Sequence, residues 1–584
     1  MVVKGAQLSQ DVRVRSVVSR RTVISAITQL GVLAVLFKWF CQVAQLRLKL
    51  WGVAGGPWPL PFVGTVLRLF SAGLENLHKT ALRDVRLFGN LYAWAYFHKP
   101  MVNTNCPYHL RRVMVTQWKR YDRSDIEQNS FGELLGQGLI LVGNDRWKEM
   151  RQLYQSGFSD RNILAFRKVL QSWSHDFVDS LLLAGGHGAQ PVDIQEAVQK
   201  FTFRAVGFFT LGIDFESKTY MADLEQTMGT SCSNYGELWF QLLAHTQLRV
   251  IFGPVRWWTI FKTASVRAFE RGHALLLRAI DRAIDARTAT PSEKMFSATS
   301  GLAAPPTFAV PNHAQHGSHS DEHPGQHHKR ARAQSSELVA TDDKESFRDL
   351  LSCMVGQKGQ RFSRTEIRHQ ALTFLFAGHD TTTNLIAWCL YLLVTHPVEL
   401  ERVQTAVRQG DTQFLRCSLL ETLRLYPSAP ARSRSLTQAD VFCPADPARC
   451  PMLRDRCSVE LPAGTGVSFA INAVHRDPEH WPDPEIFKPS RFEDHVAKAP
   501  SALLTAPWVT DEGPLKYLPF GAGPRRCIGE RLALLEAEEI CCAVLKRCKV
   551  QIAPGPPPVD EMQLTMRAKN GIHLLFDIDE DCAR

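Results

Sequence analysis

The sequence contains no Cys-X-X-Cys pair, and none of its cysteine and histidine spacings is typical of a zinc site, although it has 14 cysteines in 584 residues. No internal repeat is evident. The cysteines are scattered, and neighbours such as Cys541 and Cys542 lie in helix-like sequence, so we expect reduced thiols in a reducing compartment. With 45% hydrophobic and 22% charged residues, the composition is that of a globular protein that can bury a sizeable core without disulfides.

A basic surface on the folded part of the chain is also lacking. The formal net charge is +10, but residues 1–50 hold eight basic residues and one acidic residue, a net charge of +7. The remainder of the chain is therefore almost neutral. A nucleic-acid-binding protein needs a basic face on its folded domain, so we expect no nucleic-acid partner.

The basic N-terminal segment, residues 1–50, contains a long apolar run. Residues 22–37 are uncharged, and after Lys38 the run continues to Leu46. Because a single lysine can reach the lipid headgroups, residues 22–46 are long enough to cross a bilayer, and we predict a membrane anchor helix there. The alternatives are a buried helix and an arginine-rich mitochondrial transit peptide. Residues 51–64 follow as a proline-rich hinge that cannot continue a helix.

Helical periodicity dominates the predicted catalytic domain, residues 65–580, with short β-like runs near both of its ends. The pattern predicts a mostly α protein with small β-sheets (α+β). From about residue 288 to 344 the sequence is rich in Pro, Gly, Ser and His without periodicity, which predicts a disordered insert. Its histidines could hold a metal weakly, but a solvated tract is the simpler interpretation. Cys443, Cys450 and Cys457 are interpreted as surface residues.

The stretch "YLPFGAGPRRCIGERLALLEAE" places Cys527 between a glycine- and arginine-rich loop and a helical run. The glycines permit a tight turn that can approach a flat cofactor closely, and a helix beginning near Gly529 favours an anionic sulfur. Arg525 can pair with an acidic edge of the cofactor. Haem iron bound by a thiolate is the chemistry that needs all of these features. Phe520, Gly523, Arg525, Cys527 and Gly529 fit F-X-X-G-X-R-X-C-X-G, and the loop resembles the haem-binding signature of the cytochrome P450 family.

A second motif lies about 150 residues upstream, in the apolar helical stretch of residues 371–393. An acid and a cluster of hydroxyls interrupt its most hydrophobic part, which a merely structural helix would not require. The Thr381 hydroxyl can compete for a helix carbonyl, and Asp380 and Thr381 together can deliver protons toward bound dioxygen. The stretch is similar to the family's oxygen-activation motif A-G-X-[DE]-T-[TS], here Ala377, Gly378, Asp380, Thr381 and Thr382.

A third motif, "LLETLRLYP", places Glu421 and Arg424 three residues apart on one predicted helix face. An ion pair among such apolar neighbours must have further partners. The family completes its E-X-X-R pair with an arginine from a later segment, which the resemblance places at Arg491 in "FKPSRF". Ser490 stands where the family usually has glutamate. We assign this trio a structural role, not a catalytic one.

The haem propionates need cationic or N–H partners. Trp147 and Arg151 in "DRWKEMR" fit the W-X-X-X-R helix of the family, with both side chains on one face. Arg434 stands where many relatives place another propionate partner, and the alternative for it is an ordinary exposed loop arginine. Together with Arg525, these residues are the expected propionate contacts.

The resemblance extends from about residue 55 to residue 576, with every signature in the family's order. It implies the family's triangular, mostly α prism, with haem b between the helix at 371–393 and the Cys527 loop. It also implies a dioxygen-dependent monooxygenase that receives electrons from NADPH through a separate reductase, because no flavin- or NADPH-binding domain fits in the remaining sequence. Cytochrome b5 is a further candidate partner. We expect residence in the endoplasmic reticulum membrane with the catalytic domain facing the cytosol; the alternative is mitochondrial.

The substrate is less constrained by the sequence. Residues 238–261, with Trp257 and Trp258, fall where the family has its substrate-access helices, and can lie at a membrane surface or in the core. Membrane residence implies a lipophilic substrate. Family members that hydroxylate the ends of fatty acids often carry glutamate where this chain has Ala377, and sterol 14-demethylases carry His-Thr at 380–381. By analogy alone we favour a sterol, with a fatty-acid hydroxylase, a lipid-peroxide isomerase and a non-catalytic haem protein as alternatives.

Overall fold

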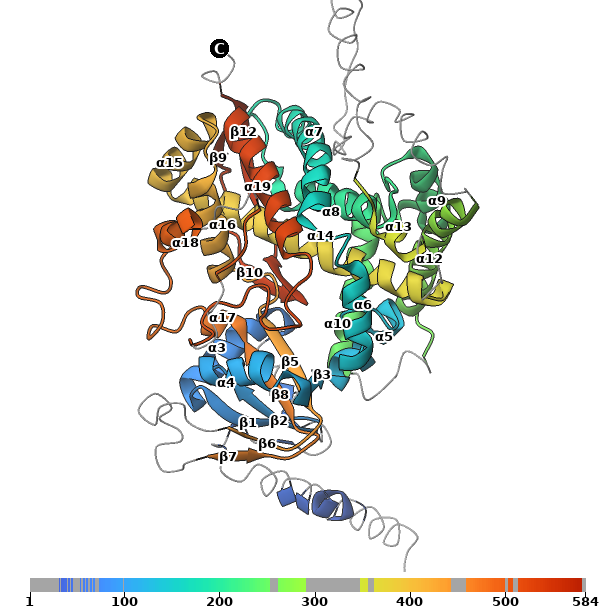
Figure 1. The fold of residues 1–584 in the computed structure, drawn as a ribbon, viewed down its shortest axis with the longest axis vertical. Coiled ribbons are helices and arrows are strands. Elements are labelled where there is room, and N and C mark those ends of the chain that lie inside the picture. Colours follow the sequence, from blue (N-terminus) through green and yellow to red (C-terminus); the bar gives the residue numbers. More distant parts are fainter. Residues whose placement is uncertain are drawn as a thin grey trace, which may run out of the picture.

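The computed structural model describes residues 73–252 except 98, 261–289, 347–355, 362–442, 458–498, 503–507 and 513–579, together with individual positions between 31 and 68. Most of the described chain is helical (Figure 1). The principal helices are α3 (Leu77–Phe88), α5 (Asp125–Leu135), α6 (Asn144–Tyr154), α7 (Asp160–Ala184), α8 (Ile194–Leu211), α9 (Lys218–Met228), α10 (Tyr235–Phe252), α12 (Ala264–Ala289), α14 (Arg364–Thr395), α15 (Pro397–Arg408), α16 (Gln413–Leu425) and α19 (Glu530–Arg547). The shorter helical segments are α4 (Pro107–Arg111), η2 (Arg112–Thr116), α13 (Leu350–Val355), α17 (Ile471–Val474), η7 (Pro489–Phe492) and α18 (Glu493–Lys498).

A five-stranded sheet lies at the end of the molecule drawn lowest in Figure 1, with strand order β1-β2-β8-β5-β3. Its strands are β1 (Leu91–Tyr96), β2 (Lys99–Thr104), β8 (Gly466–Ala470), β5 (Ala431–Leu436) and β3 (Tyr121–Arg123). The pairs are antiparallel except β2 with β8, so segments more than 300 residues apart lie side by side. This sheet has an apolar core of its own, separate from that of the helices.

Three small sheets complete the fold. A three-stranded sheet joins β4 (Val192–Asp193), β12 (His573–Ile578) and β9 (Cys548–Ile552). Two-stranded sheets pair β6 (Asp440–Phe442) with β7 (Val459–Leu461), and β10 (Asp560–Gln563) with β11 (Thr565–Ala568). The mostly α fold with small sheets that the sequence predicted is therefore confirmed.

Local signals explain where the long helices begin. Helix α14 starts with a capping box, in which the Ser363 side chain accepts from the Glu366 N–H and the Glu366 carboxylate accepts from the Ser363 N–H. Ser159 and Asp193 cap α7 and α8 in the same way with one side-chain acceptor each. Helix α14 then crosses the middle of the helical part (Figure 1) and packs against α8, α16 and α19.

Several sequence predictions fall outside the described residues. The insert at 288–344 does so apart from the end of α12, as do Cys443, Cys450, Cys457, Trp257 and Trp258. Within the predicted anchor, the described positions from residue 31 to residue 45 are helical. Among the described residues, no helix combines the length and the apolar character needed to cross a membrane. The ten described cysteines are all free thiols.

Candidate active site

The Cys527 loop leads directly into α19. The Cys527 N–H donates to the Phe520 carbonyl at 2.9 Å, which closes the turn. Gly523 has a φ of +66°, and a Cβ there would overlap the backbone carbonyl of Met114. Gly529 differs, because a Cβ there would meet only an ordinary contact with Phe158 at 3.7 Å. Position 523 thus requires glycine, both for its backbone conformation and because there is no room for a side chain. Position 529 has room for a Cβ.

The loop forms one wall of an internal cavity of about 250 Å³. Seven of the eight cofactor-binding residues that the sequence predicted line this cavity, and they come from four separate elements. They are Trp147 and Arg151 from α6, Arg434 from β5, and Phe520, Arg525, Cys527 and Gly529 from the loop and the start of α19. The eighth, Gly523, shapes the loop but does not line the cavity. The sulfur of Cys527 is accessible only inside this cavity, deep beneath the protein surface.

The protein alone does not favour an anionic sulfur. Burial raises the pKa of the Cys527 thiol, and the nearby Glu530 carboxylate raises it further. A hydrogen bond from the Gly529 N–H and the charges of Arg151 and Arg432 act in the opposite direction without outweighing burial. A metal ion bound to the sulfur would supply the missing positive charge, since coordinated thiols are deprotonated. The backbone at the start of α19 thus favours the anionic sulfur, as the sequence analysis expected, but burial has the larger effect on the pKa of the Cys527 thiol in the metal-free cavity.

Positive charge is crowded at one edge of the cavity. Arg123 of β3 and Arg434 of β5 are directly opposite one another in the antiparallel pair, a position where like charges destabilise a sheet. Burial lowers the pKa of Arg123, Arg434 and Arg525, that of Arg525 to about 10, and the neighbouring arginine charges lower those of Arg123 and Arg525 further. Arg434 is thus buried in a strand, not an exposed loop residue.

Two buried nitrogen atoms of this cluster have no partner among the described residues, Nε of Arg123 and Nη1 of Arg525. The other nitrogens of Arg525 are fixed: Nε donates to Asn144 Oδ1 at 2.8 Å, and Nη2 to the Val142 carbonyl at 3.0 Å. Arg525 Nη2 also pairs with Asp122 at 3.2 Å, so one carboxylate stands against the three guanidinium groups of Arg123, Arg434 and Arg525. Because buried positive charge is costly without enough counter-charge, the cluster can receive further anions. The two propionates of haem b are such anions, and the cavity residues fit this cofactor.

Helix α6 holds the remaining predicted contacts. Trp147 is buried, and the Arg525 guanidinium lies over its ring at 5.0 Å from the centroid. Arg151, one turn later, donates to the Arg526 carbonyl at 2.8 Å, next to Cys527 in the chain. Burial lowers the pKa of Arg151. Arg151 thus braces the cysteine loop, in addition to lining the cavity.

Helix α14 forms the opposite wall, where Ala377, Gly378 and Thr381 line the cavity. The Thr381 hydroxyl donates to the Ala377 carbonyl at 2.8 Å, while the helix continues without a break. A Cβ on Gly378 would lie 2.5 Å from a methyl carbon of Val206 in α8. In this structure the glycine therefore lets α8 pack closely.

Asp380 is placed differently from Thr381. It is buried, and its carboxylate accepts a hydrogen bond from the Thr565 hydroxyl at the start of β11. Thr565 itself lines the cavity, whereas Asp380 does not. The structure thus joins Asp380 to the cavity through a residue that the sequence analysis missed.

The predicted structural trio comes together beneath the loop. Arg424 donates to both carboxylate oxygens of Glu421, at 2.8 Å each, and both side chains are fully buried. Arg491 donates to the same carboxylate at 3.3 Å. None of the three lines the cavity.

The cavity residues that the sequence analysis missed include Arg123, Arg432, Thr565 and Glu536. Arg432 had a readable signal, because residues two apart on a strand share a face and Arg432 is two residues before Arg434. Glu536 is buried on α19 with Oε1 unpartnered among the described residues, and burial raises its pKa well above the usual range. Arg123 and Thr565 carried no local signal.

The described part of the predicted access segment belongs to the core. In α10, Leu238, Trp239 and Leu242 are fully buried, and the helix packs against α5, α12 and α8. Arg249 is also buried and pairs with Glu133 at 2.6 Å. Leu238, Trp239 and Leu242 therefore belong to the core and are not available to a membrane surface.

Comparison with known proteins agrees with this geometry. The family model of cytochrome P450 matches residues 54–281 and 293–576. The chain is 24% identical to cytochrome P450 4d2 of Drosophila melanogaster over 578 residues, covering 93% of this chain and 99% of that protein. It is 26% identical to thromboxane-A synthase of Rattus norvegicus over 587 residues, with 94% and 96% covered. It is 32% identical to cytochrome P450 4B1 of Homo sapiens over 242 residues, with 39% and 42% covered. The chain belongs to the cytochrome P450 family.

Proposed function

We propose that this protein is a membrane-associated monooxygenase that hydroxylates long-chain fatty acids or closely related lipophilic carboxylic acids. Membership of the family makes it a haem-dependent oxidoreductase of the monooxygenase type. The observation that carries the reaction type is that Cys527 and Thr381, which come from two different elements, line the same cavity. Cys527 would bind the haem iron, and Arg123, Arg434, Arg525 and other cavity residues would hold the propionates.

The substrate class is argued from the relatives and replaces the sterol that the sequence analysis favoured. Several similar proteins carry names of P450 family 4, and one that matches over nearly the whole chain is thromboxane-A synthase. Thromboxanes are oxygenated fatty acids, so a relative of that name acts in fatty-acid chemistry. These names support the fatty-acid alternative better than the sterol.

The reaction is R–H + O₂ + 2 e⁻ + 2 H⁺ → R–OH + H₂O. Haem supplies the site at which dioxygen is reduced and one oxygen atom is transferred to carbon. The protein must bind and orient the substrate, exclude bulk water and deliver two protons. An isomerase needs no such protons, so the retention of Asp380 and Thr381 favours monooxygenation.

Proton delivery is assigned to Thr381 at the cavity wall, with Asp380 behind it and Thr565 holding the Asp380 carboxylate. Thr381→Ala should leave haem bound but should separate NADPH consumption from product formation. Thr383→Ala is the matched control, because the Thr383 hydroxyl bonds to Thr202 and the His379 carbonyl, and Thr383 does not line the cavity. Equal coupling in the two variants would count against the assignment.

Electrons are proposed to come from NADPH through a separate reductase, with cytochrome b5 as a further candidate donor. We place the protein on the endoplasmic reticulum membrane through residues 22–46, with the catalytic domain in the cytosol. Fractionation of cells into microsomes and mitochondria distinguishes this location from the mitochondrial alternative. Deleting residues 1–50 should release the protein from membranes, because the described part of α10 is in the core.

Two measurements test the proposal. Reduced holoprotein exposed to carbon monoxide should show the red-shifted Soret band of thiolate-ligated haem, and Cys527→Ala should abolish it. Incubation with reductase, NADPH and equal amounts of palmitate, arachidonate and cholesterol should yield fatty acids with one added oxygen atom, detected by mass spectrometry. Oxidation of cholesterol alone would overturn the substrate class and leave the reaction type intact.

A further inference from the structure

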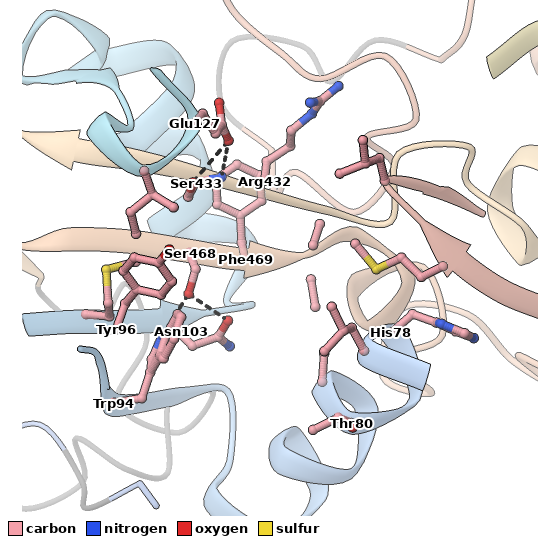
Figure 2. A pocket seen from close by; sticks show the side chains of 18 of the residues that line it. His78, Thr80, Trp94, Tyr96, Asn103, Glu127, Arg432, Ser433, Ser468 and Phe469 are labelled. Atoms are coloured by element: carbon pink, nitrogen blue, oxygen red, sulfur yellow. Dashed lines mark hydrogen bonds between the residues drawn. The ribbon is translucent and has the colours of Figure 1, made fainter. Parts of the chain in front are cut away.

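A second cavity, of about 330 Å³, adjoins the haem cavity and lies between α3, the five-stranded sheet, the start of α5 and the β10–β11 hairpin. Trp94, Asn103 and Ser468 form one wall of it, and His78 and Thr80 of α3 form the opposite wall (Figure 2). We call it the outer cavity. Cys527, which would bind the haem iron, lines the haem cavity and not the outer one, so the outer cavity would be available to another molecule.

Five side chains line both cavities and therefore form the junction between them: Ile140, Phe376, Phe469, Leu564 and Arg432. Four of the five are apolar. Arg432 is the single charged group among them. A substrate that extends from one cavity into the other must pass four hydrocarbon surfaces and one guanidinium.

The Arg432 guanidinium has no hydrogen bond or ion pair to any residue within the described part of the chain. The nearest acid in the outer cavity, Glu127, is instead engaged by the N–H and hydroxyl of Ser433, at 3.3 and 3.0 Å. Figure 2 shows the Arg432 side chain extending away from Ser433 and from the Trp94 wall. Asp84, the other acid of the outer cavity, is paired with Arg68 at 2.6 Å.

Arg432 also differs from the arginines assigned to the propionates. Arg434 is buried and Arg123 is half-buried like Arg432, but Arg123 and Arg434 line only the haem cavity, whereas Arg432 lines both cavities. A partly buried cation among apolar surfaces is costly unless an anion joins it. The two propionates already have Arg123, Arg434 and Arg525 available to them.

We propose that Arg432 is the substrate anchor: it binds the carboxylate of the lipid, while Ile140, Phe376, Phe469 and Leu564 contact the hydrocarbon chain at the junction. This assignment rests on the proposed function for its substrate class. It makes Arg432 a specificity-determining residue, because an uncharged ester of the same lipid leaves the guanidinium without a partner. The oxidised position is then set by the length of chain between the carboxylate and the iron.

The test measures binding to the holoprotein by the spin-state change of the haem spectrum and, independently, by calorimetry. Palmitate and its methyl ester are the probe pair. Wild type should bind the acid at least ~10-fold more tightly than the ester, a difference of about 1.4 kcal/mol. Arg432→Met, which keeps the length of the side chain and removes its charge, should bind the acid about 10- to 100-fold more weakly and leave the ester within about twofold.

Arg432→Lys should restore most of the preference for the acid, and Arg432→Glu should reverse it toward a long-chain alkylamine. The distribution of hydroxylated positions should broaden in Arg432→Met. Unchanged palmitate binding by Arg432→Met would overturn the inference while the fatty-acid proposal stands. Loss of haem from Arg432→Met and Arg432→Lys alike would also overturn it, because the residue would then serve the cofactor.

Failure of the proposed function has a different signature. If wild type binds neither fatty acid nor ester but binds cholesterol sulfate more tightly than cholesterol, and Arg432→Met removes that preference, the substrate class is wrong and the anchor is right. If wild type prefers no anionic lipid over its neutral counterpart, the anchor is wrong.

Discussion

The Glu421–Arg424 pair offers the sharpest prediction for stability. Arg424 makes two hydrogen bonds to the Glu421 carboxylate and three to the backbone carbonyls of His475, Pro484 and Ile486, at 2.6–3.0 Å. Arg424 thereby joins α16 to the segment that follows β8 and α17, beneath the cysteine loop. Both charged side chains have zero exposure, so removal of one partner leaves the other charge buried.

Arg424→Ala should cost about 3–5 kcal/mol, the range for breaking a buried ion pair, because the Glu421 carboxylate keeps only the Lys488 N–H at 2.9 Å and the more distant Arg491 at 3.3 Å. Arg491→Ala should cost only about 1 kcal/mol, because Arg491 makes a single 3.3 Å contact with Glu421 and is partly exposed. The double variant Glu421→Gln/Arg424→Met removes both charges together. It should be more stable than Arg424→Ala alone, although it has one more substitution.

The measurement is thermal unfolding of the holoprotein. It is monitored by far-UV circular dichroism and by the fraction of the Soret band of the carbon monoxide complex that remains. The order of stability should be wild type, Arg491→Ala, the double variant, then Arg424→Ala. If Arg424→Ala unfolds at the same temperature as Arg491→Ala, or above the double variant, the argument from an uncompensated carboxylate is wrong.

Three further predictions use other parts of the site. Gly523→Ala should prevent haem incorporation at least ~10-fold more than Gly529→Ala, because only the former Cβ collides with backbone; equal haem content would contradict this. Arg525→Leu should speed haem transfer to an acceptor apoprotein about 10-fold, whereas Arg531→Leu, which removes an exposed arginine, should not; equal rates would contradict a propionate role. Burial lowers the pKa of His475 to about 3, so the unfolded chain binds the extra proton and stability should fall as pH drops below about 6.5, by roughly 1.4 kcal/mol per unit. The slope should be shallower in His475→Gln, as measured by denaturant unfolding at pH 7 and pH 5.

The sequence predicted those parts of the site whose residues lie close together in the chain. The Cys527 loop, the Thr381 helix and the Glu421–Arg424 pair each occupy one turn or one helix, so local sequence together with the resemblance to the family could identify them. Arg123 could not be found this way, because its place depends on β3 pairing with a strand more than 300 residues later. Thr565 depends in the same way on a hairpin that packs against α14.

The aromatic segment that begins at Leu238 illustrates a different limit. Its composition fits a membrane surface and a protein core equally well, since both reward large apolar side chains. Only the packing of α5, α8 and α12 around α10 decides in favour of the core for the described residues. Burial of Cys527 was likewise not visible in the sequence, because residue spacing does not reveal it, although burial has the largest effect on the pKa of this thiol.

The β10–β11 hairpin has a consequence for shortened forms of this protein. Its Thr565 donates a hydrogen bond to Asp380, and its Leu564 lies at the junction of the two cavities. Its last residue, Ala568, exchanges two hydrogen bonds with the Gln195 side chain of α8. A transcript that stopped after α19 would still encode all the family motifs described above, and a search for those motifs would not reveal the truncation. Its product would nevertheless lack the residues that pack against α14 next to Asp380. It would also lack Leu564 at the junction of the two cavities.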